Sequence, residues 1–488
     1  MEVSKTWSWK MILVLIVAFL AEWGFPWSSN ASGKELSTPS NKLFSNVTQI
    51  EAGQFDGFAV KEDGSAWAWG AYNASKVYYA NSSAFSPVKL PIEQVKQISR
   101  GDRFYLVLKK DGTVWASGAN EHGQLGNGVQ NDNISLEPIQ VKGLSGIKAI
   151  SAGSTHGLAI DEEGKVWAWG GNDQGQLGID SRNNALLPVK VEGLPPIVAL
   201  DAGQFGSIAL DNGGVIWSWG IKKYTANATD EVRPPARLTG NGEFAAVADA
   251  GDKGVALSFN GTVWTWSNYS PDQSTVLLQP VQVKDLSDII SISSYSAVKS
   301  DGTVWQWQND QNGGTYKQVS GIEKAAKVSD AWSHHFALLE DGRVMSWGQN
   351  FFGNTGLGVI DERIETPQPI PNPIRIVLNG EEVTMPVPPI VVNQSTYVPL
   401  RGVFEKIGVK VKWDVPTRSV MASKGDTTIV LNSVTGETSV NGKVIPSDQK
   451  PISLRGSMMV PLRVIGETIG AKVDWEPATY SITIEQGE

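Results

Sequence analysis

The chain has 488 residues, enough for two or three domains, and it contains 51 Gly, 19 Trp and no Cys. The lack of Cys excludes disulfide bonds, thiolate metal sites and a Cys nucleophile. Charged residues make up 19% of the chain and the net charge is −9, which argues against a disordered protein and against nucleic-acid binding.

The N-terminus has the features of an export signal. Two Lys residues precede a short apolar run, Met11–Ala21, which falls well below the ~20 residues of a membrane-spanning helix. Ser29 and Ala31 then place small residues where a signal peptidase reads the chain. We therefore expect a signal peptide at residues 1–31, secretion or association with the cell surface, and no membrane span after cleavage. An uncleaved anchor is the alternative.

A tryptophan motif then recurs along most of the chain. The segment "EEGKVWAWG" (162–170) places Trp167 and Trp169 two residues apart, directly after a Gly-containing turn. Related motifs occur at 62–70, 110–118, 212–220, 260–267, 300–308 and 340–348. A repeat of about 40–50 residues is typical of a propeller or a solenoid.

Each unit has the pattern of a small antiparallel sheet. Three short apolar runs are followed by a fourth that begins near Pro, as in "LPVKV" (187–191), and Pro suits an edge strand. Residues i and i+2 of a strand share a face, so Trp167 and Trp169 project from one face and Val166 and Ala168 from the other. Because both faces are apolar, we expect the sheets to stack around a ring with the indoles packed between them.

The ends of the array indicate ring closure. The first unit begins at 47–53 without a preceding Pro-led run, whereas the seventh ends with such a run at 366–374. We expect this late run to complete the first sheet and so to remove exposed sheet edges. The predicted fold is an all-β seven-bladed β-propeller over residues 43–373.

A second, shorter duplication follows. The segments "YVPLRGVFEKIGVKVKWD" (397–414) and "MVPLRVIGETIGAKVDWE" (459–476) align with each other. Each predicts a strand, an amphipathic helix of about ten residues that ends at Gly408 or Gly470, and a further strand that contains Trp. Residues 374–488 are therefore predicted to form a small C-terminal α+β domain made of two similar halves.

Both regions resemble known families. The segment "AGSTHGLAIDEEGKVWAWGGNDQGQLG" (152–178) resembles a repeat of the RCC1 (regulator of chromosome condensation) family, whose members are seven-bladed propellers; beta-lactamase inhibitory protein II belongs to the same superfamily. The G-Q-L-G loop recurs in "GANEHGQLGNG" (118–128) and, as a variant, at 348–358, but units five and six lack it.

The C-terminal V-P-L-R…W-D pattern is similar to the N-terminal stalk-like domain of copper amine oxidases, which is widespread in exported proteins of Gram-positive bacteria. This resemblance implies a bacterial host. It does not imply copper, because no His follows His335. Arg401 and Arg463 of the two V-P-L-R motifs are expected to pair with buried carboxylates.

The residues that carry chemistry give no catalytic pattern. The four histidines, His122, His156, His334 and His335, occupy repeat positions rather than metal-ligand spacing. No nucleophile elbow, P-loop, Rossmann fingerprint or zincin motif occurs. We therefore predict no catalytic residue, no cofactor-binding residue and no metal site.

One aromatic loop is the best candidate for partner contacts. The segment "GAYNASKVYYANSSAF" (70–85) carries Tyr72, Tyr78, Tyr79 and Phe85, and Tyr and Asn are favoured in recognition loops. A tolerated surface insertion is the alternative interpretation.

The sequence favours an exported, non-enzymatic binding or scaffold protein. Its propeller loops would recognise an unknown protein or cell-wall polymer, the C-terminal domain would be a surface-associated or spacer module, and the chain would be a monomer. The alternative is a polysaccharide-acting lyase or hydrolase, which predicts carboxylates, Tyr or Arg that converge on the propeller axis. Nucleotide exchange on a small GTPase is disfavoured by the export signal and the acidic charge.

Overall fold

The computed structural model describes most of the chain after the predicted signal peptide. The described residues are 42–71, 84–220, 234–238, 243–249, 251, 253–267, 279–308, 315–383, 385, 387–392, 395–445, 450–454, 457–476 and 479–486. The signal peptide predicted at residues 1–31 lies outside them. Within these ranges, none of the helices combines the length and the apolar character that crossing a bilayer requires.

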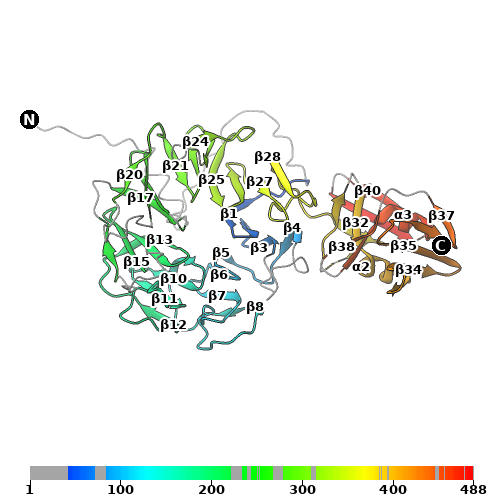
Figure 1. Ribbon diagram of the computed structural model, residues 1–488, viewed down its shortest axis with the longest axis horizontal. Helices are drawn as coiled ribbons and strands as arrows, with labels where there is room; N and C mark the ends of the chain where they lie inside the picture. Colours follow the sequence, from blue (N-terminus) through cyan, green and yellow to red (C-terminus); the bar gives the residue numbers. More distant parts are fainter. Residues whose placement is uncertain are drawn as a thin grey trace, which may run out of the picture.

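The described strands up to Pro369 form seven four-stranded antiparallel sheets arranged in a ring, numbered here in chain order as sheet 1 to sheet 7 (Figure 1). Sheets 1 to 4 contain β1 (Val47–Ala52), β2 (Asp56–Lys61), β3 (Ala66–Gly70), β4 (Ala84–Lys89), β5 (Val95–Arg100), β6 (Phe104–Lys109), β7 (Val114–Gly118), β8 (Ser135–Gln140), β9 (Ile147–Ala152), β10 (His156–Asp161), β11 (Val166–Gly170), β12 (Ala185–Lys190), β13 (Ile197–Ala202), β14 (Gly206–Asp211), β15 (Ile216–Gly220) and β16 (Ala236–Arg237). Sheets 5 to 7 contain β17 (Phe244–Asp249), β18 (Lys253–Ser258), β19 (Val263–Ser267), β20 (Val281–Gln282), β21 (Ile289–Ile292), β22 (Ser296–Lys299), β23 (Val304–Gln308), β24 (Thr315–Gln318), β25 (Ala325–Asp330), β26 (His334–Leu339), β27 (Val344–Gln349) and β28 (Arg363–Pro369).

The first strand of each sheet is the innermost one. β1 contacts β5, and the same contact continues through β9, β13, β17, β21 and β25. β25 in turn contacts β1, so the first strands form an unbroken circle around the axis. The fourth strands, such as β8 and β12, lie on the outside (Figure 1).

The turn between the second and third strands follows from local sequence. In sheet 2 Gly112 adopts a positive φ of 79°, and the Asp111 carboxylate accepts hydrogen bonds from the backbone N–H and the hydroxyl of Thr113. The Thr113 hydroxyl then accepts the indole N–H of Trp115 at 3.1 Å. The D-G-T-V-W pattern therefore encodes both the hairpin and the partner of its first indole.

The indoles pack between adjacent sheets, as predicted. Trp169 is fully buried in a cluster with Leu106 and Ala116 of sheet 2, and Trp167 packs against the same cluster. Val166 and Ala168 point the other way, into a cluster that contains Trp219 of sheet 4. The period-two pattern thus assigns the correct side chains to the two faces.

The second indole of several sheets also forms a hydrogen bond to the preceding sheet. Trp169 donates its Nε1–H to the Gln124 carbonyl at 2.9 Å, and Trp219 donates to the Gln176 carbonyl at 2.9 Å. Both acceptors lie in G-Q-L-G loops. By contrast, Trp266 follows a unit without that loop, and its buried Nε1 has no partner among the described residues.

Ring closure differs from the prediction. The late run β28 pairs with β27 of its own sheet, and sheet 1 is completed by its own fourth strand, β4. The prediction was wrong because the outer strand of sheet 6, β24, contains no Pro, which made the last Pro-led run look surplus. The two ends of the ring meet instead through an antiparallel bridge between Leu43, which precedes β1, and Pro371, which follows β28.

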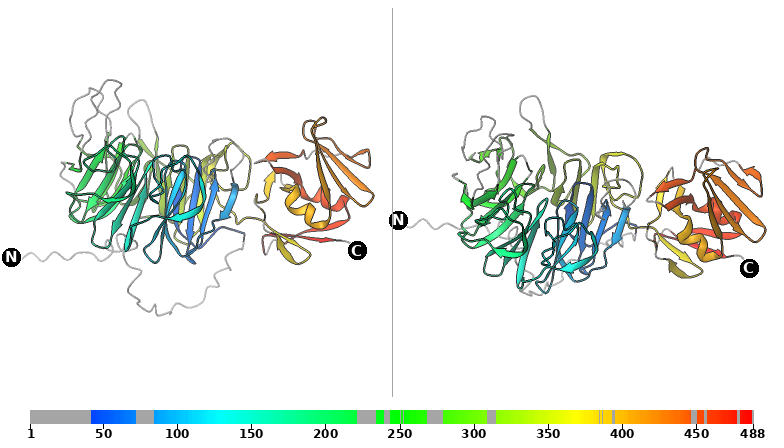
Figure 2. Two further views of the ribbon diagram at one scale, coloured as in Figure 1. Left: turned by 90° about the horizontal axis from the view of Figure 1, so that it is seen from below. Right: turned by 60° about the horizontal axis from the view of Figure 1, so that its bottom comes forward.

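The C-terminal domain lies beside the ring, next to β4 and β28 (Figures 1 and 2). Its elements are β29 (Arg375–Leu378), β30 (Glu381–Val383), β31 (Ile390–Val392), β32 (Ser395–Pro399), α2 (Leu400–Phe404), the 3₁₀ helix η1 (Glu405–Ile407), β33 (Lys410–Asp414), β34 (Ser419–Lys424), β35 (Thr427–Asn432), β36 (Thr438–Val440), β37 (Lys443–Ile445), β38 (Ile452–Leu454), β39 (Ser457–Pro461), α3 (Leu462–Thr468), β40 (Ala471–Glu476) and β41 (Ser481–Gln486). Its strands form three sheets, ordered β30-β29-β41-β40, β31-β32-β39-β38 and β33-β34-β35-β36-β37.

The two V-P-L-R motifs occupy equivalent places. β32 and β39 pair antiparallel, and each leads directly into a helix, α2 or α3. Gly408 and Gly470 follow with φ of 79°. The helices are shorter than predicted, because α2 gives way to a 3₁₀ turn after Phe404 and α3 ends at Thr468.

The predicted pairing of the two motif arginines was wrong. Arg401 and Arg463 face solvent and pair with the exposed Glu405 and Glu467 one helical turn later, at 3.9 and 3.6 Å. Exposed pairs of this kind contribute little, about 0.3–0.5 kcal/mol. The core is instead apolar, with Phe404 and Ile465 fully buried.

Candidate functional site

The axis of the ring is lined by side chains that join neighbouring sheets. The Gln49 side-chain amide donates to the Ile98 carbonyl and accepts the Ile98 backbone N–H. Gln97 makes the same two hydrogen bonds with the backbone of Ile150. We call this set the axial belt. Its side chains are Gln49, Glu51, Gln97, Ser99, Ser151, Asp201, Ser293 and Ser329. The last link joins the ends of the ring, because the backbone N–H of Ala52 donates to Ser329 Oγ at 2.9 Å.

Two carboxyl groups of the axial belt are electrostatically unusual. Burial, reinforced by the charge of Asp201, raises the pKa of Glu51 to about 8. Burial also raises the pKa of Asp201 to about 7, against the opposing hydrogen bond from the Asp249 amide. Glu51 and Asp201 are both half-buried residues. Near neutral pH these carboxyls can therefore hold protons.

The belt carboxyls already have structural partners. Glu51 accepts the backbone N–H of Arg100, while Asp201 accepts the Ser151 hydroxyl on one oxygen and the Asp249 amide on the other. Arg100 is engaged as well, because its guanidinium binds the buried Asp56 at 2.7 Å. The carboxylates and the Arg that an axial enzyme site would use do gather at the axis, but they hold sheets together there.

Two buried histidines also join sheets. His156 Nε2 forms a hydrogen bond with Ser207 Oγ of sheet 4 at 3.0 Å, and His334 Nε2 donates to the Asp56 carbonyl of sheet 1 at 3.0 Å. Burial lowers the pKa of His156 to about 3 and that of His334 to about 4, so both stay neutral. His335 binds Asp330 at 2.8 Å and stacks on Trp347.

Among the described residues, no three His, Asp or Glu side chains form a group that could hold a metal ion. His122 belongs to a G-Q-L-G loop.

One end of the ring carries exposed aromatic side chains. The loops between first and second strands and between third and fourth strands lie at the same end, because the start of β10 pairs with the end of β11. We call this end the loop face. Trp332 there is 86% exposed and Phe351 is 54% exposed. Beside them, Phe352 contacts Phe55 of sheet 1 edge to face, with 5.2 Å between ring centroids.

Sequence reasoning missed Trp332. It occupies the position of Ser154 in sheet 3, between the first and second strands, and so lies outside the V-W-x-W slots. An indole that the repeat does not explain is the signal that could have identified it. Isolated exposed apolar residues are ordinary, but Trp332 and Phe351 belong to two loops of the same sheet.

The predicted partner loop is described only at its two ends, residues 70–71 and 84–85. Tyr72, Tyr78 and Tyr79 lie outside the described residues. Phe85 is 7% exposed and packs against Ile390, Tyr397 and Met459 of the C-terminal domain among other residues. Its aromatic ring therefore joins the two domains.

The ring of four-stranded sheets places the chain in the β-propeller class, and a solved structure has the same fold. That structure, of Kap60 bound to yeast RCC1 (Prp20), superposes with a TM-score of 0.53 and 16% identity, over 72% of this chain and 91% of that one. Identity at this level establishes the fold alone.

The repeats and the C-terminal domain define the family relationship. Models of the regulator of chromosome condensation (RCC1) repeat match residues 111–160 and 163–210, and also 95–124, 147–176 and 332–354. The copper amine oxidase N-terminal domain model matches residues 377–484. The chain thus contains RCC1 repeats followed by a copper amine oxidase N-terminal domain. That domain offers copper no imidazole or thiolate ligand, because it has neither His nor Cys.

Two curated relatives share the propeller region. The ultraviolet-B receptor UVR8 of Arabidopsis thaliana is 26% identical over 327 residues, which are 60% of this chain and 62% of that protein. The guanine nucleotide exchange factor SRM1 of Saccharomyces cerevisiae is 24% identical over 271 residues, 50% of this chain and 52% of that protein. The chain therefore spans little more than half the length of the curated relatives it matches.

Proposed function

We propose that this chain is an exported, non-enzymatic binding protein whose propeller recognises a protein or cell-envelope partner. It is secreted or held at the cell surface, and the C-terminal domain is a surface-associated or spacer module. The apolar run at Met11–Ala21 supports export. Relatives that share the RCC1 repeat carry receptor and exchange-factor names, which are binding and regulatory roles.

The proposal includes two finer structural points. The first is that the ring is a closed seven-bladed propeller, which the unbroken circle of first strands supports. The second is that the C-terminal domain arose from two similar halves, which the antiparallel pairing of β32 with β39 supports. A closed ring gives the loops a rigid frame, and rigid scaffolds favour loop-based recognition.

The observation that carries the binding proposal is the aromatic loop face. An indole that is 86% exposed contributes nothing to the core, and Trp is the residue most enriched among the dominant contacts of protein interfaces. The loop face also contains the ends of the predicted partner loop at residues 70–85, which joins third and fourth strands.

Binding is tested by mixing the chain with secreted proteins and purified wall polysaccharide of the host and measuring saturable association. Trp332→Ala should weaken the interaction about 30-fold or more, corresponding to ~2 kcal/mol. Phe259→Ala is the matched control, because this aromatic is 43% exposed in the β18–β19 turn at the opposite end of the ring. No saturable binding, or equal losses in both variants, would contradict the proposal.

A second candidate, a polysaccharide lyase or hydrolase with a site at the axis, is favoured by one observation. The raised pKa of Glu51 suits a general acid, and Glu51 is a half-buried residue of the axial belt. The test is product formation from wall polysaccharide, with Glu51→Gln expected to abolish it. Wild-type protein that releases no product removes this candidate.

A further inference from the structure

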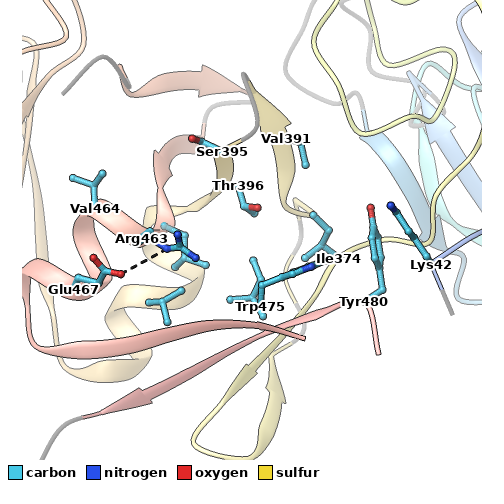
Figure 3. A pocket seen from close by; sticks show the side chains of 13 residues that line it. Lys42, Ile374, Val391, Ser395, Thr396, Arg463, Val464, Glu467, Trp475 and Tyr480 are labelled. Atoms are coloured by element: carbon cyan, nitrogen blue, oxygen red, sulfur yellow. Dashed lines mark ion pairs between the residues drawn. The ribbon is translucent and has the colours of Figure 1, made fainter. Parts of the chain in front are cut away.

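A cavity of about 580 Å³ lies in the C-terminal domain, on the side that faces the start of the ring (Figure 3). It is bounded by α3, β40, β41 and the β31–β32 hairpin, and Lys42 lines it from the ring side. Its volume falls within the range of small-molecule sites, about 300–1,000 Å³. None of the residues that line it belongs to the axial belt or to the loop face.

One wall of the cavity is an aromatic platform. Trp475 is 40% exposed although it lies in a strand of the domain, and its indole extends into the cavity (Figure 3). Tyr480 supports it edge to face, with 5.1 Å between ring centroids and an interplanar angle of 78°. This edge-to-face contact restricts the orientation of the indole, and its 40% exposure leaves part of Trp475 accessible to a ligand.

Hydroxyl and charged groups line the rest. Ser395 and Thr396 provide hydroxyls from the start of β32, and the Arg463 side chain extends into the cavity from α3 (Figure 3). Only three of the lining residues carry charge: Lys42, Arg463 and Glu467. Glu467 pairs with Arg463 at 3.6 Å, so the balance of two cations and one anion leaves the cavity positive.

We propose that this cavity binds an acidic pyranose, a uronic-acid unit of an extracellular polysaccharide. The C–H face of a pyranose ring suits the Trp475 platform, and its hydroxyls suit Ser395, Thr396 and the five donors of Arg463. The sugar carboxylate offsets the positive charge and would pair with Lys42, because the other lining cation, Arg463, already pairs with Glu467. An acidic peptide could use the cations but has no flat C–H face to match the exposed indole.

The first motif of the domain supplies a built-in comparison. Trp413 occupies the position equivalent to Trp475 and is also 40% exposed, and Arg401 with Glu405 repeats the pair at Arg463. The place equivalent to Tyr480 is taken by Arg418, which shares its positive φ but provides no aromatic support. None of these first-motif residues lines the cavity.

The test uses the full chain and isothermal titration with digalacturonate and its dimethyl ester, which share ring shape but differ in charge. We expect saturable binding of digalacturonate that weakens with salt, and weaker binding of the ester. Trp475→Ala should lower the affinity about tenfold or more, equivalent to 1.4 kcal/mol, while Trp413→Ala changes it less than twofold. Lys42→Ala should reduce the preference for the acid over the ester.

Several results would overturn the inference. These are no saturable binding of either sugar, equal losses in Trp475→Ala and Trp413→Ala, or equal affinity for acid and ester. Tighter binding of a poly-Glu peptide than of digalacturonate would assign the cavity to acidic peptides instead. Because Trp332 lies in the other domain, Trp475→Ala should leave loop-face binding intact, so this inference and the proposed function can fail separately.

Discussion

The hydrogen bond from the second indole of sheet 3 to the preceding loop makes a quantitative prediction. Trp169→Phe keeps an aromatic ring but deletes the N–H that binds the Gln124 carbonyl at 2.9 Å. Trp266→Phe makes the same change where the N–H has no partner among the described residues. Both indoles lie over an equivalent glycine of the second strand, Gly157 or Gly254, so the two variants lose similar packing.

The difference between the two variants measures the hydrogen bond. Trp169→Phe leaves a buried carbonyl unpaired, which costs about 1–3 kcal/mol beyond the packing loss. Trp266→Phe removes a buried donor that has no partner among the described residues and should cost less. Equilibrium urea unfolding, followed by far-ultraviolet circular dichroism on the full chain, should show the larger drop in midpoint for Trp169→Phe at equal slopes. An equal or larger drop for Trp266→Phe would refute the reasoning.

Two further predictions concern the axial belt and the contact between domains. The pKa values of Glu51 and Asp201 are raised to about 8 and about 7 in the folded state, so the folded state binds protons more tightly than the unfolded state. The urea concentration at the unfolding midpoint should therefore decrease as the pH is raised from about 5 to about 8. Glu51→Gln should flatten that pH profile, and an unchanged slope would contradict the assignment. Phe85→Ala should loosen the contact between ring and C-terminal domain and enlarge the radius of gyration in small-angle scattering, whereas Phe259→Ala should not. A compact Phe85→Ala protein would show that other contacts hold the domains.

Most of the ring could be predicted from the sequence because its motif repeats. Spacing and the period-two pattern place Trp169 and Val166 on the correct faces, because those positions depend only on strand geometry. The Asp-Gly turns could be predicted as well, because they also depend only on local backbone geometry. The two V-P-L-R motifs likewise predicted the strand, helix and following strand of each half, although α2 and α3 are shorter than the pattern indicated.

Features that depend on contacts between residues far apart in the sequence could not be predicted. The closure by Leu43 and Pro371 was missed because the outer strand of sheet 6 lacks the Pro that marks the others. Phe85 looked like a surface aromatic because its neighbours, such as Met459, lie in another domain. Trp332 lies outside the repeated V-W-x-W slots, so the repeat pattern does not indicate it. The cavity beside Trp475 depends on Tyr480 and Lys42, which no motif links.

Closure of the ring is tested most directly by a disulfide between its two ends. Leu43 and Pro371 form a pair flanked by hydrogen bonds from Phe44 to Ile370 and from Asn372 to Lys42, which makes it a non-hydrogen-bonded antiparallel pair. Such pairs have Cα atoms about 4.5 Å apart, within the range of about 4.4–6.8 Å that a disulfide needs.

The chain has no native Cys, so a Leu43→Cys/Pro371→Cys variant can form only the designed bond within one molecule. Mild oxidation should convert it fully to an intramolecular disulfide, seen as a faster band on a non-reducing gel. A Leu43→Cys/Leu187→Cys variant, with the second site on the outer strand of sheet 3, should remain reduced. Failure of the first pair to cross-link within one molecule would show that the ends of the ring do not meet.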